Sequence, residues 1–208
     1  IAPGLISIKY GFKGPNFTTV SACASSSNAI IDGLNYIRLG YADVIIAGGS
    51  EAAVTCAGIG GFNAMHALST RNHEPDKASR PFDSERDGFV LGEGGGCIIL
   101  EDLNHAVKRN AKIYCELAGG GLSADAHHMT APHPEGNGAK KVMENCLQDA
   151  KLTVDEVDHI NMHGTSTPLG DIAETKAVLD VFKSNAYSIN INSTKSMTGH
   201  LLGAAGAV

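Results

Sequence analysis

One cysteine stands where a reactive thiol would be expected. Cys23 lies within VSACASSSNA, residues 20–29, directly before a segment with helical periodicity. Unsatisfied backbone N–H groups and the positive end of a helix dipole stabilise a thiolate and lower the pKa of a thiol. The small neighbours of Cys23 would also leave room for a substrate. Because most isolated cysteines are simply buried and apolar, Cys23 becomes a candidate nucleophile only with suitable partners.

Two histidines lie in loops that follow strand-like segments. His163 opens HGTSTPLGD, whose glycines and proline force a loop, and His200 ends KSMTGH. Because α/β proteins place their chemistry at strand ends, both imidazoles could carry protons or stabilise an oxyanion for a nucleophile. A loop histidine is usually a solvated surface group. The similar settings of these two, each beside Gly and Thr, favour a function.

Lys195 precedes His200 in the same loop. A loop lysine is normally an exposed ammonium. If it were buried near a histidine, its charge would instead keep that imidazole neutral and favour negative charge that develops nearby. The burial of Lys195 therefore distinguishes the two interpretations.

Patterns that could bind metals or nucleotides fail on inspection. His159 and His163 have the spacing of a helical zinc pair, but on the strand expected here they would lie about 13 Å apart. The cysteines include no CxxC pair. Three further histidines share a loop without a fixed ligand geometry: His127, His128 and His133. The sequence therefore predicts no metal site.

The composition excludes some classes of partner. The chain has 208 residues, of which 43% are hydrophobic, and a net charge of −6, and its lysines and arginines form no basic run. The electrostatic footprint of a nucleic-acid-binding protein is therefore missing. No apolar stretch approaches the roughly 18 residues that span a bilayer, and no signal peptide is evident. We expect a cytoplasmic protein with neither nucleic-acid nor membrane partners.

Apolar β-rich runs alternate with helical patterns along the chain. Strands are expected at residues 42–47, 97–100, 113–117, 159–162 and 187–191. Helices are expected at residues 26–39, 138–150 and 171–182. This order predicts an α/β protein with a mainly parallel or mixed sheet that is covered on both faces.

Both ends of the sequence look interrupted. The chain begins with Ile1 rather than Met, and the final GHLLGAAGAV enters a helical pattern without a cap. We therefore expect the sequence to be a piece of a longer protein.

Four motifs, taken together, resemble the β-ketoacyl-acyl-carrier-protein synthases and, among them, the elongating synthase II group. They are VSACASSSNAI around Cys23, RPFDSERDGFVLGEGGG at 80–96, HGTSTPLGDIAE at 163–174 and KSMTGHLLGAAG at 195–206. The motifs follow the family's order and spread over almost the whole chain. The resemblance implies a thiolase-like fold, a layered α/β sandwich of two similar halves, usually in a homodimer.

The resemblance also implies how the chain maps onto that fold. Residues 1–110, approximately, would form the later part of the N-terminal half, and residues 111–208 the start of the C-terminal half. The family's own N-terminal and C-terminal segments would be absent, so that only a truncated central portion of the domain is represented.

The matching residues inherit roles from the resemblance. Cys23 would be the acyl-accepting nucleophile, His163 and His200 the paired active-site histidines, and Lys195 the lysine that supports them.

Further residues would bind the substrate. Phe62 would lie beside the acyl pocket. Threonines that line the path of the phosphopantetheine arm would be Thr130, Thr165 and Thr167. His66 stands where this group often has an arginine that meets the acidic carrier protein, and we expect a weaker contact there.

The implied activity is that of an acyltransferase, a 3-oxoacyl-acyl-carrier-protein synthase. Malonyl-acyl carrier protein would condense, with loss of CO₂, with an acyl group on Cys23 during fatty-acid elongation. The only prosthetic group would be the phosphopantetheine of the carrier protein, and the fragment alone would be inactive. A ketosynthase of a polyketide or aryl-polyene pathway remains an alternative. A non-catalytic chain-length partner subunit is another, although such subunits typically lack the nucleophilic cysteine.

Overall fold

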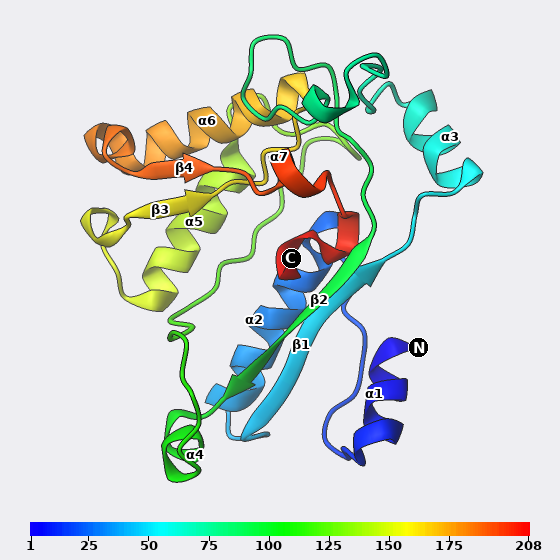
Figure 1. Ribbon diagram of the computed structural model, residues 1–208. Coiled ribbons are helices and arrows are strands. Elements are labelled where there is room, and N and C mark those ends of the chain that lie inside the picture. The colour runs from blue at the N-terminus through cyan, green and yellow to red at the C-terminus, as the bar shows by residue number, and fades with distance from the viewer. The chain divides into compact units, whose positions relative to one another are not determined.

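The computed structural model describes all 208 residues. The chain divides into two compact units, and each is built from separate stretches of the sequence (Figure 1). The first unit comprises Ile1–Glu51, Gly94–Leu117 and Leu202–Val208, and the second comprises Ala52–Glu93 and Ala118–Leu201. The predicted division near residue 110 stays a prediction.

The first unit is organised around one antiparallel strand pair. β1 (Val44–Glu51) pairs with β2 (Gly94–Glu101) along its whole length, from Val44 opposite Glu101 to Glu51 opposite Gly94. The strands predicted at 42–47 and 97–100 are confirmed, but β1 continues through Gly48 and Gly49 to Glu51, and β2 begins earlier, at Gly94. A Cβ atom at Gly48 would lie 2.1 Å from the carbonyl oxygen of Gly96, so the glycines permit a close approach of the two backbones.

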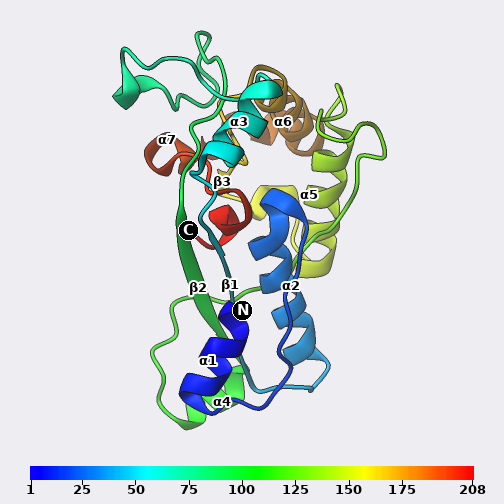
Figure 2. The ribbon, with the colours of Figure 1, turned by 90° about the vertical axis from the view of Figure 1, so that its right-hand side faces the viewer.

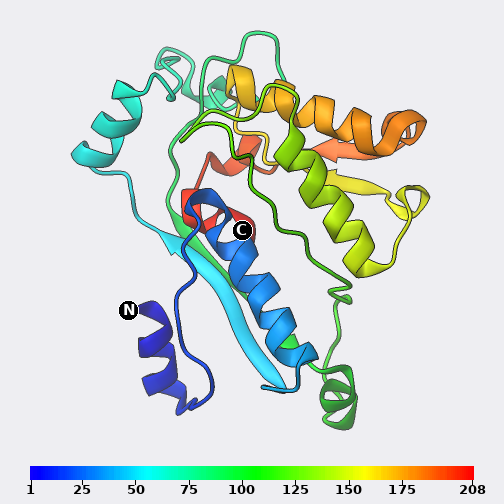
Figure 3. The ribbon, with the colours of Figure 1, turned by 180° about the vertical axis from the view of Figure 1, so that it is seen from behind.

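Helix α2 (Ser25–Arg38) covers one face of this strand pair, as Figures 2 and 3 show. Gly33 faces the strands, where a Cβ would lie 2.9 Å from Leu100 Cδ1 and 3.3 Å from Ile45 Cγ2. The helix can therefore approach the sheet closely. The predicted helix at 26–39 is confirmed.

Four helices have no counterpart among the predicted elements. They are α1 (Ala2–Tyr10), α3 (Cys56–Ala64), α4 (Leu103–Lys108) and α7 (Lys195–Thr198). The strand expected at 113–117 is wrong, because no strand of the chain pairs with this segment. Ile113 and Tyr114 are 50% and 84% exposed. An apolar run forms a stable strand only where a neighbouring strand accepts its backbone hydrogen bonds.

The second unit combines a parallel strand pair with two helices. β3 (His159–Asn161) pairs with β4 (Asn190–Asn192), and α5 (Asn137–Ala150) lies beside α6 (Pro168–Phe182). Both predicted helices are confirmed, and Pro168 starts α6 earlier than expected because proline suits the first helical turn. The buried core comprises Met162, Val178, Phe182, Ala186 and Ile189.

The parallel pair brings two loops to one edge of the sheet. The strands predicted at 159–162 and 187–191 are confirmed, although β4 begins only at Asn190 because Lys183–Tyr187 form a 3-10 helix. The N–H of Met162 donates to the carbonyl of Asn192 at 2.8 Å, and the two strands separate after this bond. The loop after β3 leads to α6, and the loop after β4 leads to α7 (Lys195–Thr198).

Short 3-10 helices complete the description. They are η1 (Ala22–Ala24), η2 (Pro75–Lys77), η3 (Val154–Glu156), η4 (Lys183–Tyr187) and η5 (Leu202–Ala207). No helix in the structure is both long and apolar enough to cross a membrane. With one antiparallel and one parallel strand pair, the strands are mixed rather than mainly parallel.

Candidate active site

Cys23 occupies a tight turn in the first unit. It is the middle residue of η1, and α2 begins two residues later at Ser25. The Ser21 N–H donates to Ser25 Oγ at 2.9 Å, and that hydroxyl donates to the Ala22 carbonyl at 2.7 Å. Ala22 has a φ of 50°, a left-handed conformation that costs a non-glycine residue roughly 1 kcal/mol. A strained, hydrogen-bonded turn therefore presents Cys23 at the start of a helix, where the dipole favours a thiolate.

The small residues after Cys23 serve mainly in packing. Ser26 is fully buried, and its Oγ accepts the N–H of Gly206 at 2.9 Å. A Cβ at Gly206 would lie 2.1 Å from Ser27 Oγ, and one at Gly49 would lie 2.8 Å from Ser26 Cβ. The first turn of α2 is thus pressed between β1 and η5. The expectation that these residues leave room for a substrate is wrong for Ser26, while Ala22 and Ala24 remain exposed.

The two candidate histidines meet in the second unit. His163 follows β3, and His200 is held by its N–H bond to the Val90 carbonyl at 2.7 Å. Their ring centroids are 5.1 Å apart and nearly perpendicular, at 88°. Parallel pairing of β3 and β4 brings together two residues that are far apart in the sequence.

Lys195 is buried, with 7% of its surface exposed, so the interpretation as a surface ammonium is excluded. Burial, together with the Lys195 charge, lowers the pKa of His163 to about 4. By accessible surface His163 is an exposed residue, whereas His200 is only 3% exposed, so burial acts more fully on His200. Burial, His163 and Lys195 lower the pKa of His200 to about 3. Both imidazoles are therefore neutral near pH 7, and each carries one N–H donor.

Glu174 fixes the loop that carries His163. Its carboxylate oxygens accept the backbone N–H groups of His163 and Gly164, each at 2.7 Å. Burial raises the pKa of Glu174, while these two hydrogen bonds and Lys195 lower it. These contacts span eleven and ten residues, far more than the three-residue spacing of a capping box, so no local sequence signal pointed to Glu174.

Asp171 ties a second loop to the start of α6. It is 1% exposed, and its Oδ2 accepts the Phe82 N–H at 2.7 Å and pairs with Arg86 Nε at 3.3 Å. Burial raises the pKa of Asp171, and the Phe82 N–H and the Arg86 charge oppose that shift. Arg86 also donates to the carbonyls of Thr167 and Pro168. The RPFDSERDG stretch therefore supports the His163 loop from outside.

The predicted substrate-binding threonines differ in burial and in hydrogen-bond partners. Thr165 is buried, and its hydroxyl shares a 3.0 Å hydrogen bond with Thr167 just after His163. Thr130 is exposed in another loop, where its N–H donates to His128 Nδ1 at 3.2 Å. The hydrogen bond of Thr130 is therefore local to its own loop.

An aromatic series leads from Phe62 to the histidines. The Phe62 ring, on α3, meets the Phe89 ring edge-on at 5.2 Å, and Phe89 meets His200 at 5.3 Å. Phe89 is 6% exposed and was not among the predicted site residues. Phe89 belongs to the RPFDSERDGFVLGEGGG motif at 80–96, and that motif could have pointed to a role for Phe89 at the site. His66, just beyond α3, is exposed with a φ of 51°.

Neither unit contains a ready metal site. Within each one, no three His, Cys or carboxylate side chains bring their donor atoms together. The rings of His127 and His133 meet edge-on at 5.0 Å, while His128 Nδ1 accepts backbone N–H groups. The expected absence of a metal or redox cofactor stays a prediction.

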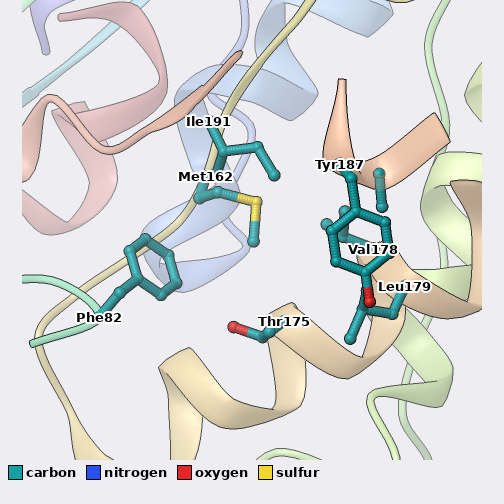
Figure 4. A pocket seen from close by; sticks show the side chains of 8 residues that line it. Phe82, Met162, Thr175, Val178, Leu179, Tyr187 and Ile191 are labelled. Atoms are coloured by element: carbon teal, nitrogen blue, oxygen red, sulfur yellow. The ribbon is translucent and has the colours of Figure 1, made fainter. Parts of the chain in front are cut away.

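A cavity of about 230 Å³ lies in the second unit, and no histidine lines it (Figure 4). Its lining is mostly apolar and consists of Phe82, Met162, Thr175, Val178, Leu179, Ala186, Tyr187 and Ile191. Two of these side chains carry a hydroxyl, and that of Thr175 already donates to the Asp171 carbonyl at 2.8 Å. This cavity is therefore a gap beside the core rather than a place for chemistry.

Comparison with known proteins identifies the family. Residues 1–106 match the beta-ketoacyl synthase N-terminal domain, and residues 114–208 match the beta-ketoacyl synthase C-terminal domain. The 3-oxoacyl-[acyl-carrier-protein] synthase 2 of Coxiella burnetii is 54% identical over 208 residues, 100% of this chain and 50% of that protein. A mitochondrial 3-oxoacyl-[acyl-carrier-protein] synthase of Arabidopsis thaliana is 49% identical over 100% of this chain and 46% of its own length. The chain thus spans about half the length of the curated relatives it matches.

Solved structures agree with this assignment. One is a type II PKS acyl-carrier protein in complex with its ketosynthase bound to the hexaketide; the TM-score is 0.97 at 41% identity, over 99% of this chain and 51% of that one. A beta-ketoacyl synthase from Burkholderia phymatum matches with a TM-score of 0.91 at 40% identity, over 97% and 48% of the two chains. The chain therefore belongs to the β-ketoacyl synthase family and has its thiolase-like α/β fold.

Proposed function

We propose that the chain belongs to an elongating 3-oxoacyl-acyl-carrier-protein synthase. In this proposal, malonyl-acyl carrier protein condenses with an acyl group held on Cys23 and gives a 3-oxoacyl-acyl carrier protein. One observation carries the proposal, namely the pair of neutral imidazoles, His163 and His200, beside the buried Lys195. The Coxiella burnetii relative is named a 3-oxoacyl-[acyl-carrier-protein] synthase 2, which supports the same activity.

The first half-reaction is acyl transfer. The Cys23 thiolate attacks the thioester carbonyl of the acyl carrier protein, a new C–S bond forms, and the bond to the phosphopantetheine sulfur breaks. The leaving thiolate takes up the proton that Cys23 gave away. The start of α2 supports this role, because backbone N–H groups at a helix N-terminus stabilise both the thiolate and an oxyanion.

The second half-reaction needs hydrogen-bond donors more than acids. When the malonyl group loses CO₂, the electrons of the broken C–C bond pass to the thioester oxygen and form an enolate. Neutral His163 and His200 each offer an N–H to that oxygen, and one such donor is typically worth about 3 kcal/mol. The enolate carbon then attacks the acyl carbonyl, and the bond to Cys23 sulfur breaks to restore the thiolate.

Lys195 and Glu174 support the donors in this scheme. A cation beside the imidazoles disfavours their protonation, so that they donate hydrogen bonds without being consumed as acids. Glu174 holds the backbone of His163 through two N–H groups. Thr165 and Thr167 supply hydroxyls for the phosphopantetheine arm, and we extend that role to Thr130.

We also propose the assembly and its location, which is a cytoplasmic homodimer. The partner is an acyl carrier protein, which carries the phosphopantetheine, and the enzyme itself uses no metal or redox cofactor. Support for this partner comes from the solved ketosynthase whose description includes its acyl-carrier protein. Leu5 and Ile8 on α1 are 60% and 82% exposed, and such exposed apolar side chains support burial of this helix against another chain.

A ketosynthase of a polyketide or aryl-polyene pathway is the second candidate. It is favoured by the TM-score of 0.97 to a ketosynthase described with a hexaketide. The chain length of the products made from malonyl-acyl carrier protein would separate the two, since a fatty-acid synthase adds one two-carbon unit before the keto group is reduced. A non-catalytic partner subunit is disfavoured by the presence of Cys23.

The decisive experiment is intact-protein mass spectrometry of the complete protein after incubation with an acyl-carrier-protein thioester. Peptide mapping should place a single acyl group on Cys23, and Cys23→Ala should carry none. The Cys23→Ala variant should still decarboxylate malonyl-acyl carrier protein, and His163→Ala should lose that activity. A folded wild-type protein that takes up no acyl group would refute the proposal and favour a non-catalytic subunit.

A further inference from the structure

A buried serine links the two loops that carry the candidate site. Ser193 directly follows β4 and is 5% exposed. Its hydroxyl donates to the Gly164 carbonyl at 2.9 Å and, more weakly, to the His163 carbonyl at 3.4 Å. The same oxygen accepts the Lys195 N–H at 3.3 Å. One side chain therefore contacts the backbone of the His163 loop and of the Lys195 loop.

The other end of Lys195 is held by a second serine. Ser79 lies just before the RPFD stretch, and its hydroxyl donates to the Lys195 carbonyl at 2.5 Å. The Gly199 N–H donates to the same carbonyl at 3.0 Å. The backbone of Lys195 is thus bound at its N–H by Ser193 and at its C=O by Ser79.

Local structure alone cannot fix Lys195. It begins α7, which has only four residues, and so short a helix has little stability of its own. Gly164 and Ser193 also interlock, because a Cβ at Gly164 would lie 2.6 Å from Ser193 Cβ. Side-chain hydrogen bonds from neighbouring segments must therefore fix the position of the Lys195 backbone, from which the side chain and its ammonium extend.

We propose that Ser193 and Ser79 are positioning residues that fix the Lys195 backbone and thereby hold its ammonium beside His163 and His200. This inference rests on the proposed function of the histidine pair. The charged and titratable groups that act on these imidazoles are Lys195, the other histidine of the pair and, through the His163 backbone, Glu174. Displacement of Lys195 removes one of the influences that lower the pKa of both imidazoles.

The test is the pH profile of malonyl-acyl-carrier-protein decarboxylation by the complete protein. Ser193→Ala and Ser79→Ala should each lower kcat about tenfold with little change in KM, as expected when donors lose their alignment. The acid limb of kcat/KM should also move to higher pH, because the imidazoles protonate more readily. Ser188→Ala is the matched control, since the Ser188 hydroxyl only makes a local bond to the Asn185 carbonyl at 2.9 Å.

The outcomes separate this inference from its foundation. Wild-type kinetics in both variants, or a rate loss without a shift of the acid limb, would overturn the positioning role. If Ser193→Ala fails to fold, Ser79→Ala carries the same test from the other side of Lys195. A wild-type protein that neither takes an acyl group on Cys23 nor decarboxylates would instead refute the proposed function.

Discussion

Acidification should destabilise the protein through His200. Its pKa in the folded protein is about 3, because burial, His163 and Lys195 disfavour the imidazolium. In an unfolded chain the value is about 6.5. Between these pH values the unfolded chain binds a proton that the folded protein does not. The free energy of unfolding therefore falls as the pH is lowered.

The size of the effect follows from the pKa difference. Each pH unit below about 6.5 removes about 1.4 kcal/mol per differentially bound proton. Between pH 7.5 and pH 5, His200 should thus account for a loss of about 2 kcal/mol. His200 is 3% exposed, so solvent screens little of this effect. His163 acts in the same direction, and its accessible surface reduces its share.

Urea unfolding of the complete protein between pH 7.5 and pH 5, followed by circular dichroism, measures the loss. Wild type should lose about 2 kcal/mol more than His200→Gln over this range, by the linkage relation above. His73→Gln, whose side chain is 74% exposed, should behave as wild type. The carboxyl groups are common to all three proteins and cancel in the difference. Equal losses in all three proteins would refute the argument that the buried, neutral His200 lowers the free energy of unfolding in acid.

Three further predictions concern stability, each measured as the urea unfolding free energy of the complete protein. Asp171→Ala leaves the Arg86 guanidinium without its buried carboxylate and should cost about 3–5 kcal/mol. Asp180→Ala is the control: it removes an exposed partner of Lys140 and should cost under about 1 kcal/mol. If Asp171→Ala and Asp180→Ala lost equal stability, the Arg86–Asp171 pair would not be a buried, stabilising ion pair. Gly49→Ala puts a Cβ 2.7 Å from the Gly203 carbonyl and should cost about 1–3 kcal/mol, whereas Gly60→Ala meets nothing within 4 Å and should cost nothing. Glu174→Ala strands the N–H groups of His163 and Gly164 and should cost about 2 kcal/mol, with a larger effect on decarboxylation than Asp180→Ala; an unchanged rate would contradict its role.

The elements that the sequence predicted are those with a strong periodic signal. The helices at 26–39 and 138–150 have an apolar face that packs against a sheet or a core, and the apolar side chains on that face are half-buried. The missed helices α1 and α3 consist largely of apolar and small residues, so periodicity could not separate helix from strand. The run at 113–117 has the composition of a strand, but a strand also requires a partner, which composition does not contain.

The candidate site was predictable where a side chain carries the chemistry itself. Cys23, His163 and His200 could be found because reactive residue types recur in small, glycine-rich loops after strands. Glu174 and Ser193 could not be found in this way, because each acts through backbone groups of another loop. The Ser193 contact with Gly164 depends on the parallel register of β3 and β4, and no local pattern encodes that register.

The burial of Lys195 is the feature that joins stability to chemistry. An ammonium taken out of water costs several kcal/mol, and a nearby half-buried carboxylate such as Glu174 offsets only part of that cost. An apolar residue of similar size would pack there with less penalty, so stability alone does not explain a lysine. Its charge does lower the pKa of both imidazoles. Because a neutral imidazole can donate a hydrogen bond to a developing enolate and remain unchanged, the cost of burying Lys195 is best understood as the condition for two permanent N–H donors.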